Sequence, residues 1–355
     1  MKYYKFIKPI LFKLSPEFAH DLAIYAMANN VLPKAKLLDY PSLRVNVLGL
    51  NFSNPIGLAA GFDKNARALN CLLNQGFGFV EAGTVTPLPQ TGNPKPRLFR
   101  LESDQAIINR FGFNSKGSDF FLHKLQDRPK NGIIGVNIGK NKLTEDAISD
   151  YVLLLKKFYN YSDYITINIS SPNTPGLRGM QSKNELDKLL AELSKTRKSL
   201  SKNNSIHVPI LIKIAPDLTI TEREDIASSV IEFNMDGLII SNTTINYKDK
   251  LHSIYKNEAG GLSGKPLFTA SNEILRDMYK LTKGKILIVG AGGIFSAEDA
   301  YTKIKNGASL LQIYSCLIYK GFEIIEEIKF GLDQMLSKDG FTNISQAVGT
   351  ETYSQ

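Results

Sequence analysis

The segment Tyr164-Ile-Thr-Ile-Asn-Ile-Ser-Ser-Pro-Asn-Thr-Pro-Gly-Leu-Arg178 joins an apolar run to a polar loop that contains two prolines. Its first four residues have the β-branched and aromatic composition of a strand, so Asn168 and Ser171 stand where a strand passes into a loop. In a parallel α/β protein this end of a strand faces the ligand. The prolines restrict the loop backbone and Gly176 permits unusual conformations, which together suit a lid. The simpler interpretation is a turn that caps the following helix.

The same pattern recurs along the chain. After residue 40, apolar runs alternate with amphipathic segments, which is typical of repeated βα units. Eight such units predict an α/β fold, a (β/α)₈ TIM barrel. An open doubly wound sheet is the alternative, but the Gly-rich residues 290–293 follow the seventh run and lack the dinucleotide fingerprint. The expected strands are residues 55–60, 78–83, 133–138, 164–170, 208–215, 237–242, 286–290 and 309–313, with 44–51 as a small extra strand at the barrel floor.

Composition excludes several classes of protein. A hydrophobic content of 43% in 355 residues is ample for a large core, and no apolar run is long enough to span a bilayer. The net charge is +9, but lysines and arginines are scattered between acidic residues, so we expect no nucleic-acid binding. Two cysteines and four dispersed histidines form neither a disulfide framework nor a ligand set, so we expect no metal.

Glycine or a polar side chain stands at the carboxyl end of every expected strand, the rim where barrel enzymes place their sites. Each residue has a simpler explanation as a turn or cap residue, but the same pattern at eight strand ends is harder to dismiss. The candidate site residues at or near these ends are Ala60, Gly61, Lys64, Thr84, Asn137, Asn168, Lys213, Ser241, Asn242, Thr243, Gly264, Gly292, Gly293, Tyr314 and Ser315.

Two features of this rim indicate an anionic ligand. Gly292 and Gly293 follow the seventh strand, where backbone N–H groups commonly bind phosphate. Lys64 and Lys213 would be buried cations without a partner unless an anion meets them. An isoalloxazine ring suits one lysine because a nearby cation stabilises the charge of the reduced ring. A carboxylate substrate suits the other.

Residues 1–40 form an extension with a different character, and residues 41–355 form the barrel domain. Tyr3, Ile7, Ile10, Leu11 and Leu14 share one side of a first helix and lysines share the other. Because a proline inside a helix costs about 3 kcal/mol, we expect this helix to start near Pro9 or to kink there. We expect a second helix with Ser15 as N-cap, an apolar face formed by Phe18, Leu22, Tyr25 and Ala26, and an end at Pro33. The two helices could lie on a membrane surface or cover the mouth of a tunnel. The alternative is a helical hairpin that packs on the barrel.

Four stretches taken together carry a specific resemblance. They are Gly57-Leu-Ala-Ala-Gly-Phe-Asp-Lys64, Asn109-Arg-Phe-Gly-Phe-Asn114, Gly260-Gly-Leu-Ser-Gly264 and the loop from Asn168 to Arg178. The chain resembles the quinone-dependent, membrane-associated class of dihydroorotate dehydrogenases, class 2. The resemblance implies an FMN barrel that oxidises dihydroorotate to orotate in de novo pyrimidine synthesis and passes electrons to a quinone. The soluble class carries cysteine at the base position and lacks the N-terminal helices, whereas this chain has Ser171 and an extension.

The resemblance also implies roles for individual residues. Ser171 is the expected catalytic base, flanked by Thr174 and Phe113. The implied substrate ligands are Lys64, Asn109, Arg110, Phe111, Gly112, Phe113, Asn168, Asn173, Asn242 and Thr243. The implied FMN site comprises Ala60, Gly61, Lys64, Thr84, Asn137, Asn168, Lys213, Ser241, Gly264, Gly292, Gly293, Tyr314 and Ser315. His20, Arg100 and Tyr314 are the expected quinone neighbours.

The resemblance further implies a monomer on the cytoplasmic face of a bacterial inner membrane, held there by the N-terminal helices. Two other functions stay open from the residues. One is an FMN barrel that oxidises a 2-hydroxy acid, which normally needs a histidine base, and no histidine falls at an expected strand end. The other is a non-catalytic, membrane-bound binding protein.

Overall fold

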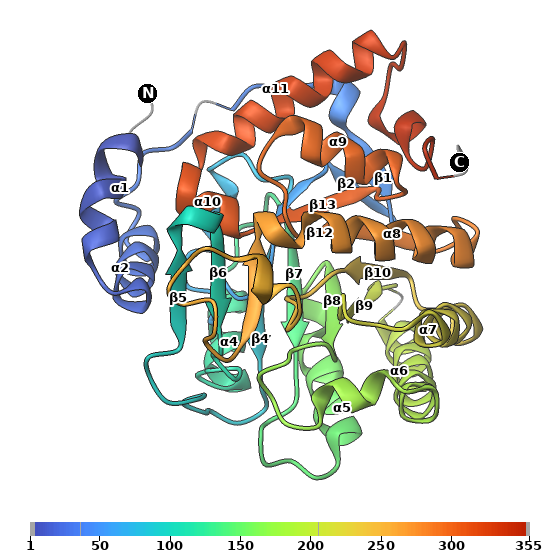
Figure 1. The fold of residues 1–355 in the computed structure, drawn as a ribbon. Helices are drawn as coiled ribbons and strands as arrows, with labels where there is room; N and C mark the ends of the chain where they lie inside the picture. The colour runs from blue at the N-terminus through green and yellow to red at the C-terminus, as the bar shows by residue number, and fades with distance from the viewer. Residues whose placement is uncertain (1–3, 36, 205, 353–355) are drawn as a thin grey trace.

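The computed structural model of the chain describes residues 4–35, 37–204 and 206–352. A closed barrel of eight parallel strands lies at its centre, in the order β10-β12-β13-β3-β4-β7-β8-β9 (Figure 1). The strands are β3 (Ile56–Leu58), β4 (Phe79–Val85), β7 (Ile133–Ile138), β8 (Tyr164–Asn168), β9 (Ile210–Ile214), β10 (Gly237–Ile240), β12 (Leu287–Ala291) and β13 (Leu310–Ile313). Each coincides with one of the eight predicted runs, so the predicted barrel is confirmed.

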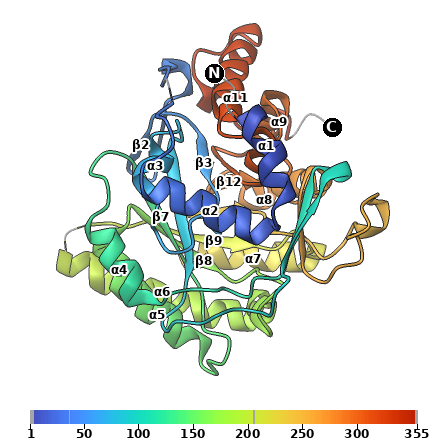
Figure 2. The same ribbon diagram turned by 90° about the vertical axis from the view of Figure 1, so that its left-hand side faces the viewer.

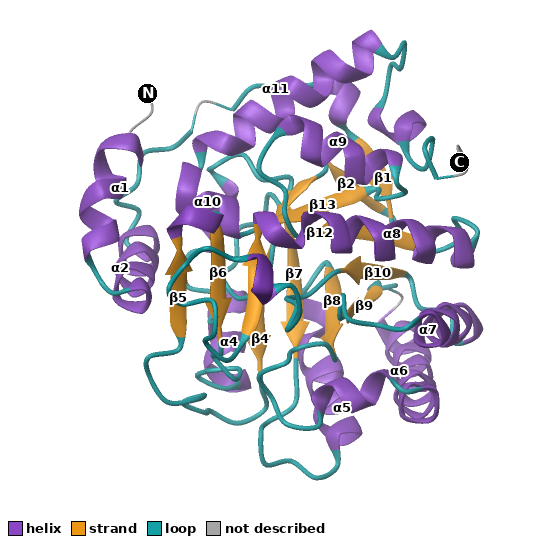
Figure 3. Ribbon diagram, viewed as in Figure 1, coloured by secondary structure: helices purple, strands orange, loops and turns teal. Residues whose placement is uncertain are grey.

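Helices cover the outside of the barrel (Figure 3). They are α3 (Leu69–Leu73), α4 (Ser118–Gln126), α5 (Ala147–Phe158), α6 (Lys183–Asn204), α7 (Ile220–Glu232), α8 (Phe268–Thr282), α9 (Ala297–Lys305), α10 (Ser315–Lys320) and α11 (Glu323–Lys338). Adjacent helices pack on one another around the ring, as α5 does on α6 and α6 on α7. Because strands of this barrel are enclosed on both faces, every residue of β7 is buried, and Asn137 is its one polar side chain.

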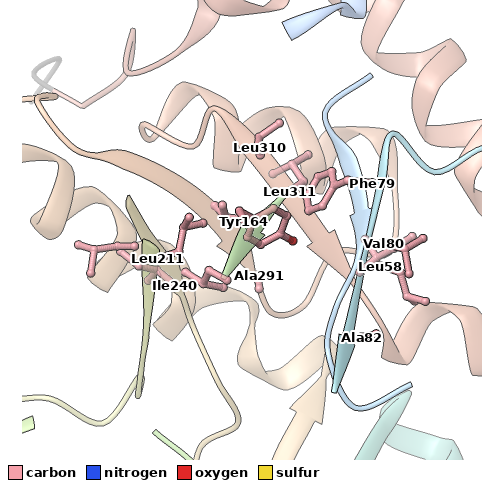
Figure 4. Packing of buried hydrophobic residues seen from close by; sticks show 14 of the residues in the cluster. Leu58, Phe79, Val80, Ala82, Tyr164, Leu211, Ile240, Ala291, Leu310 and Leu311 are labelled. Atoms are coloured by element: carbon pink, nitrogen blue, oxygen red, sulfur yellow. The ribbon is translucent and has the colours of Figure 1, made fainter. Parts of the chain in front are cut away.

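Large rings fill the interior of the barrel (Figure 4). Phe79 and Tyr164 meet edge to face with their ring centroids 6.2 Å apart. Glycines on neighbouring strands make room for them, because a Cβ on Gly57 would lie 2.2 Å from the Phe79 ring and one on Gly135 would lie 2.1 Å from the Tyr164 ring. The interior is therefore a packed core, and a ligand can enter only at its ends.

Two small sheets were incompletely predicted. Residues 44–51 were expected to form one strand, but they contribute to a hairpin of β1 (Val45–Val47) and β2 (Leu50–Phe52). The chain turns at Leu48 and Gly49, both of which have positive φ. A three-stranded antiparallel sheet of β5 (Leu98–Leu101), β6 (Ala106–Asn109) and β11 (Gly261–Gly264) was not predicted. This second sheet brings residues 98–109 beside the expected Gly260–Gly264 motif.

The N-terminal helices α1 (Tyr4–Lys13) and α2 (Pro16–Ala28) lie against one side of the barrel (Figure 2). Of the two expectations for Pro9, a start near it is wrong, because α1 begins at Tyr4 and contains the proline, and a kink there stays a prediction. The expected end at Pro33 is also wrong, since α2 stops at Ala28, although it does begin directly after Ser15. In the part of the chain that the structure describes, no helix is both long and apolar enough to cross a bilayer.

Polar contacts fasten both helices to the barrel domain. The Arg100 guanidinium, on β5, donates to the carbonyl oxygens of Leu11 and Phe12 at 3.1 Å and also to that of Leu14. Arg97 forms a salt bridge of 2.8 Å with Glu17 of α2. These contacts satisfy the last carbonyls of α1 and leave its outer face uncovered.

The outer face of the helix pair is apolar. Phe6, Ile10 and Phe18 are 78%, 66% and 57% exposed, and Ile7, Leu22 and Tyr25 are also exposed. Ile24 and Met27 form the buried side of α2 instead of the predicted apolar face. Tyr3, which was expected to share the apolar face of the first helix, lies outside the described residues.

Candidate active site

A cavity opens at the carboxyl ends of the barrel strands and contains about 1150 Å³ of free space, counting its open mouth. The small sheet forms one wall through Leu98, Ile107, Asn109 and Ser263. Most of the predicted site residues line it, namely Ala60, Gly61, Lys64, Thr84, Asn109, Phe111, Gly112, Phe113, Asn168, Ser171, Asn173, Lys213, Ser241, Asn242, Thr243, Gly264, Gly292, Gly293, Tyr314 and Ser315.

Three of the residues predicted for the catalytic, FMN and substrate sites do not line the cavity. Asn137 is fully buried beneath it and accepts a hydrogen bond of 2.6 Å from Thr84. Arg110 points to Glu258, with 2.6 Å between Nη1 and Oε2. Thr174 is buried in the loop behind Ser171, and its hydroxyl has no hydrogen-bond partner among the described residues. Of these three, Asn137 supports a residue that does face the cavity, Thr84.

The floor of the cavity is built on a buried carboxylate that the sequence did not single out. Glu81 is fully buried in β4. Its Oε1 accepts from Asn137 at 2.8 Å, and its Oε2 accepts from Gln312 at 2.8 Å. Tyr164 and Thr166 each donate to Oε2 at 3.0 Å. Four donors from three other strands satisfy the charge and fix the amides of Asn137 and Gln312.

Lys213 supplies a cation above this floor. The side chain lines the cavity and is 6% exposed, and no hydrogen bond or ion pair joins it to any residue of the described chain. Burial lowers the pKa of Lys213, and the nearby Glu81 carboxylate opposes that shift. Gln312 of β13 lines the same cavity and has a buried Oε1 atom without a partner among the described residues. An unpaired cation and an unpaired amide oxygen facing one cavity fit the polar edge of a flavin ring.

Glycines shape the far side of the cavity for a close approach. Gly293 has φ of +77°, and a Cβ there would lie 2.5 Å from the Phe268 Cα. Gly264 has φ of +102°, and its Cβ would lie 2.4 Å from the carbonyl oxygen of Gln105. Only glycine fits at either position, and backbone N–H groups at such a turn suit a phosphate.

The Ser171 loop closes over the polar side of the cavity. Ser171 is 7% exposed, and its Oγ accepts a hydrogen bond of 3.3 Å from the backbone N–H of Asn173. The loop leads through a short 3₁₀ helix, Leu177–Gln181, into α6. Gly176 has φ of +71° with no atom near its Cβ position, so the loop has free space on that side.

Side-chain amides face the same space from four elements. Asn173 donates to Asn109 Oδ1 at 3.3 Å, which joins the loop to β6. Asn242 donates to the Ser170 hydroxyl at 2.9 Å and to Asn168 Oδ1 at 3.3 Å. Oriented amides of this kind suit a planar molecule with alternating carbonyl and N–H groups.

Lys64 is the second cation at the cavity. Its Nζ lies 4.0 Å from the centre of the Phe111 ring. Burial lowers the pKa of Lys64 to about 8, while the Asp21 and Glu17 carboxylates of α2 oppose the shift. An anion that reached this lysine would therefore favour its protonated form.

The three predicted quinone neighbours lie on the side of the barrel where the N-terminal helices pack, and His20 belongs to α2 itself. His20 and Tyr314 both pack edge to face on Phe62, with ring centroids 5.4 Å and 5.5 Å away. Burial lowers the pKa of His20 to about 3, so this imidazole is neutral. The Arg100 guanidinium donates its hydrogen bonds to carbonyl oxygens at the end of α1. Of the three, only Tyr314 lines the cavity, and no residue of α1 or α2 does.

The family model described as dihydroorotate dehydrogenase matches residues 42–336. The chain belongs to the dihydroorotate dehydrogenase family. Dihydroorotate dehydrogenase (quinone) of Azorhizobium caulinodans is 47% identical over 354 residues, covering 99% of each chain. The mitochondrial dihydroorotate dehydrogenase (quinone) of Mus musculus is 45% identical, covering 98% of this chain and 90% of its own. A crystal structure of DHODH from Eimeria tenella in complex with ferulenol superposes with a TM-score of 0.92 at 41% identity, covering 97% of this chain and 99% of that one.

Several lining residues were missed from the sequence. Gln312 stands within the predicted strand 309–313, where a single polar residue in an apolar run was the available signal. Ser263, whose hydroxyl is 2.9 Å from that of Ser315, lies inside the quoted Gly260–Gly264 motif. Leu98 and Ile107 reach the cavity only because β5 and β6 pair beside it, and no local pattern indicates that pairing.

Proposed function

We propose that this protein oxidises (S)-dihydroorotate to orotate in de novo pyrimidine synthesis, with FMN as the hydride acceptor and a membrane quinone as the final electron acceptor. The similarity to enzymes named dihydroorotate dehydrogenase (quinone) along almost the whole chain supports the activity. The observation that carries it is one cavity that joins Ser171, the amide array and an unpaired Lys213.

FMN fits the residues of the cavity. Lys213 and Gln312 would meet the polar edge of the ring, Thr84 and Asn168 would lie beside it, and the Gly292–Gly293 turn would hold the phosphate. Bound FMN supplies the acceptor for the hydride that leaves C6 of dihydroorotate. The remaining proposed contacts are those of Ala60, Gly61, Lys64, Asn137, Ser241, Gly264, Tyr314 and Ser315.

Ser171 is the proposed base for the proton at C5 of dihydroorotate. Serine is a weak base in water, so it needs a hydrogen-bonded route for the proton and the exclusion of bulk solvent. The unpartnered hydroxyl of Thr174, three residues along the loop, is a candidate for that route. Phe113 lines the same cavity and helps to exclude water.

The substrate would be held by the amides and by one cation. Asn109, Asn173 and Asn242 offer donors and acceptors to the pyrimidine carbonyl and N–H groups, and Asn168 and Thr243 complete the set. Lys64 would meet the carboxylate. Phe111, Gly112 and Phe113 line the cavity and would contact the substrate directly. Arg110 would act through the loop that carries it, because its side chain is paired with Glu258.

The quinone would approach from the N-terminal helices. Residues 1–40 would form the unit that contacts the membrane and residues 41–355 the catalytic unit. The exposed apolar residues of α1 and α2 support a peripheral attachment, with His20, Arg100 and Tyr314 near the electron path. We place the protein, as a monomer, on the cytoplasmic face of a bacterial inner membrane.

Neither alternative function gains support. None of the four histidines, all within the described part of the chain, lines the cavity, although oxidation of a 2-hydroxy acid normally uses a histidine base. The similarity to enzymes named dihydroorotate dehydrogenase (quinone) argues against the non-catalytic, membrane-bound binding protein. An anaerobic absorption spectrum tests the proposal, because dihydroorotate should bleach the flavin band of the purified protein. A protein that binds FMN but is not bleached would contradict it.

A further inference from the structure

Lys303, on α9, is a fully buried cation that no proposed catalytic step uses. Its Nζ donates to the Ser271 hydroxyl at 2.7 Å and to Asn272 Oδ1 at 3.0 Å. Among the residues that the structure describes, no carboxylate forms an ion pair with it. Asp299, one helical turn earlier, accepts a hydrogen bond of 2.8 Å from the Phe295 N–H instead. Burial lowers the pKa of Lys303 to about 7.

A short chain of contacts joins this cation to the cavity wall. The Ser271 hydroxyl that accepts from Lys303 has two carbonyl oxygens within hydrogen-bond distance, that of Gly292 at 3.0 Å and that of Phe268 at 2.9 Å. The packing is tight, because a Cβ on Gly292 would lie 3.1 Å from the Ser271 side chain. A Cβ on Gly290 would lie 3.3 Å from Lys303 Cδ. The lysine therefore lies behind the end of β12, on the opposite side of the turn from the cavity.

We propose that Lys303 is a positioning residue for the phosphate of the cofactor. It holds the Gly292–Gly293 turn through Ser271 and places a positive charge behind N–H groups that face an anion. A charge in a low-dielectric interior acts over a longer range than one in water, so direct contact is not required. The inference rests on the proposed function, because FMN supplies the anion at this turn. It also explains why a lysine without a carboxylate is retained in the core, since the bound phosphate is its counter-ion.

The test compares FMN with riboflavin, which has the same ring and lacks the phosphate. The full-length protein is freed of flavin, and both affinities are measured by flavin fluorescence. Lys303→Gln keeps a donor for Ser271 and Asn272 and removes the charge. We expect it to weaken FMN about tenfold more than it weakens riboflavin. Lys329→Gln is the matched control, because Lys329 is also buried but pairs with Glu326 at 2.8 Å and does not line the cavity.

The outcomes separate this inference from the function on which it rests. Equal weakening of FMN and riboflavin in Lys303→Gln would mean that the lysine serves only packing, and the inference would fail while the FMN site stood. A parent protein that does not prefer FMN to riboflavin would overturn both. If Lys303→Gln does not fold, Ser271→Ala replaces it, because it cuts the link to Gly292. An unchanged FMN preference in that variant would overturn the inference.

Discussion

Arg178 Nη1 lies 2.8 Å from Asp217 Oδ2, and this pair fixes the Ser171 loop to the rest of the cavity. The same guanidinium donates to the carbonyl oxygens of Ser170 at 3.1 Å and Thr243 at 2.9 Å. Asp217 in turn accepts from the hydroxyl of Thr244. The pair thus ties the residue before the proposed base to the strand end that carries the proposed substrate ligands.

Loss of this planar contact should misplace Ser171. A lysine at position 178 cannot reach two carbonyls and a carboxylate in one plane, so Arg178→Lys should lower kcat/KM for dihydroorotate about 10- to 100-fold. FMN content should not change. Arg128→Lys is the control, since Arg128 makes a similar 2.8 Å pair with Asp163 away from the cavity. Equal losses in both variants would show that the effect is general destabilisation.

Ser171→Ala tests the proposed base directly. The variant should bind FMN and orotate, yet its flavin should be reduced by dihydroorotate at least about 100-fold more slowly, in line with the loss of a general base. Reoxidation of pre-reduced flavin by quinone should hardly change, because Ser171 takes no part in that half-reaction. Stopped-flow absorbance measures both steps. Reduction at the parental rate would move the assignment to Thr174 or Ser170.

Lys213→Met tests the charge of Lys213, because it removes the cation while largely keeping the shape of the cavity. Methionine matches the length of lysine but cannot stabilise negative charge on a reduced ring, so the midpoint potential of the bound flavin should fall and its reduction by dihydroorotate should slow. Spectroelectrochemistry of the purified protein measures the potential. A normally loaded variant with the parental potential would contradict the placement of Lys213 beside the ring.

The barrel could be predicted because each of its strands is recognisable from its own residues. A strand buried on both faces is a continuous apolar run, and 133–138 matches β7 at both ends. Strand β11, Gly261–Gly264, has two glycines and poor strand propensity, so only its pairing with β6 makes it a strand. The three-stranded sheet therefore could not be predicted from sequence.

In the site, too, local sequence indicates some residues, whereas others are recognisable only from their tertiary contacts. Lys213 was predicted because a lysine interrupts an apolar run near its carboxyl end, and its lack of a partner agrees with that reasoning. Glu81 is a single charged residue inside the predicted run 78–83 but was overlooked, because its four donors come from three other strands. Arg100 was expected beside the quinone, and nothing in its sequence context indicates the carbonyls of α1 to which it donates.

Binding of orotate should depend on pH through Lys64. Burial lowers the pKa of Lys64 to about 8, so the lysine is charged below that pH and loses its proton above it. A carboxylate ligand favours the charged form, and its affinity should therefore be constant at lower pH and fall about tenfold per unit above pH 8. Titration of the flavin spectrum with orotate from pH 6 to about 9.5 measures this. In Lys64→Gln the affinity for orotate should be low at every pH, and its fall above pH 8 should disappear. If the fall persists in this variant, another group causes the pH dependence.

The exposed face of the N-terminal helices allows a sharper test of membrane attachment than their deletion. Phe6, Ile10 and Phe18 are exposed, so replacing all three by serine should leave the fold intact. Full burial of each side chain in the headgroup region would contribute about 1.5–3 kcal/mol, and the triple variant should therefore no longer float with lipid vesicles. Reduction of the flavin by dihydroorotate should keep its rate, while KM for a long-chain quinone should rise.

A matched control uses apolar residues that are equally exposed elsewhere. Leu143 and Ile254 are 90% and 88% exposed and lie outside α1 and α2, so their replacement by serine removes similar apolar surface. This double variant should float with vesicles and reoxidise with the parental quinone KM. If the triple variant also floats and keeps that KM, α1 and α2 are packing elements of the barrel domain, and the quinone reaches the flavin by another route.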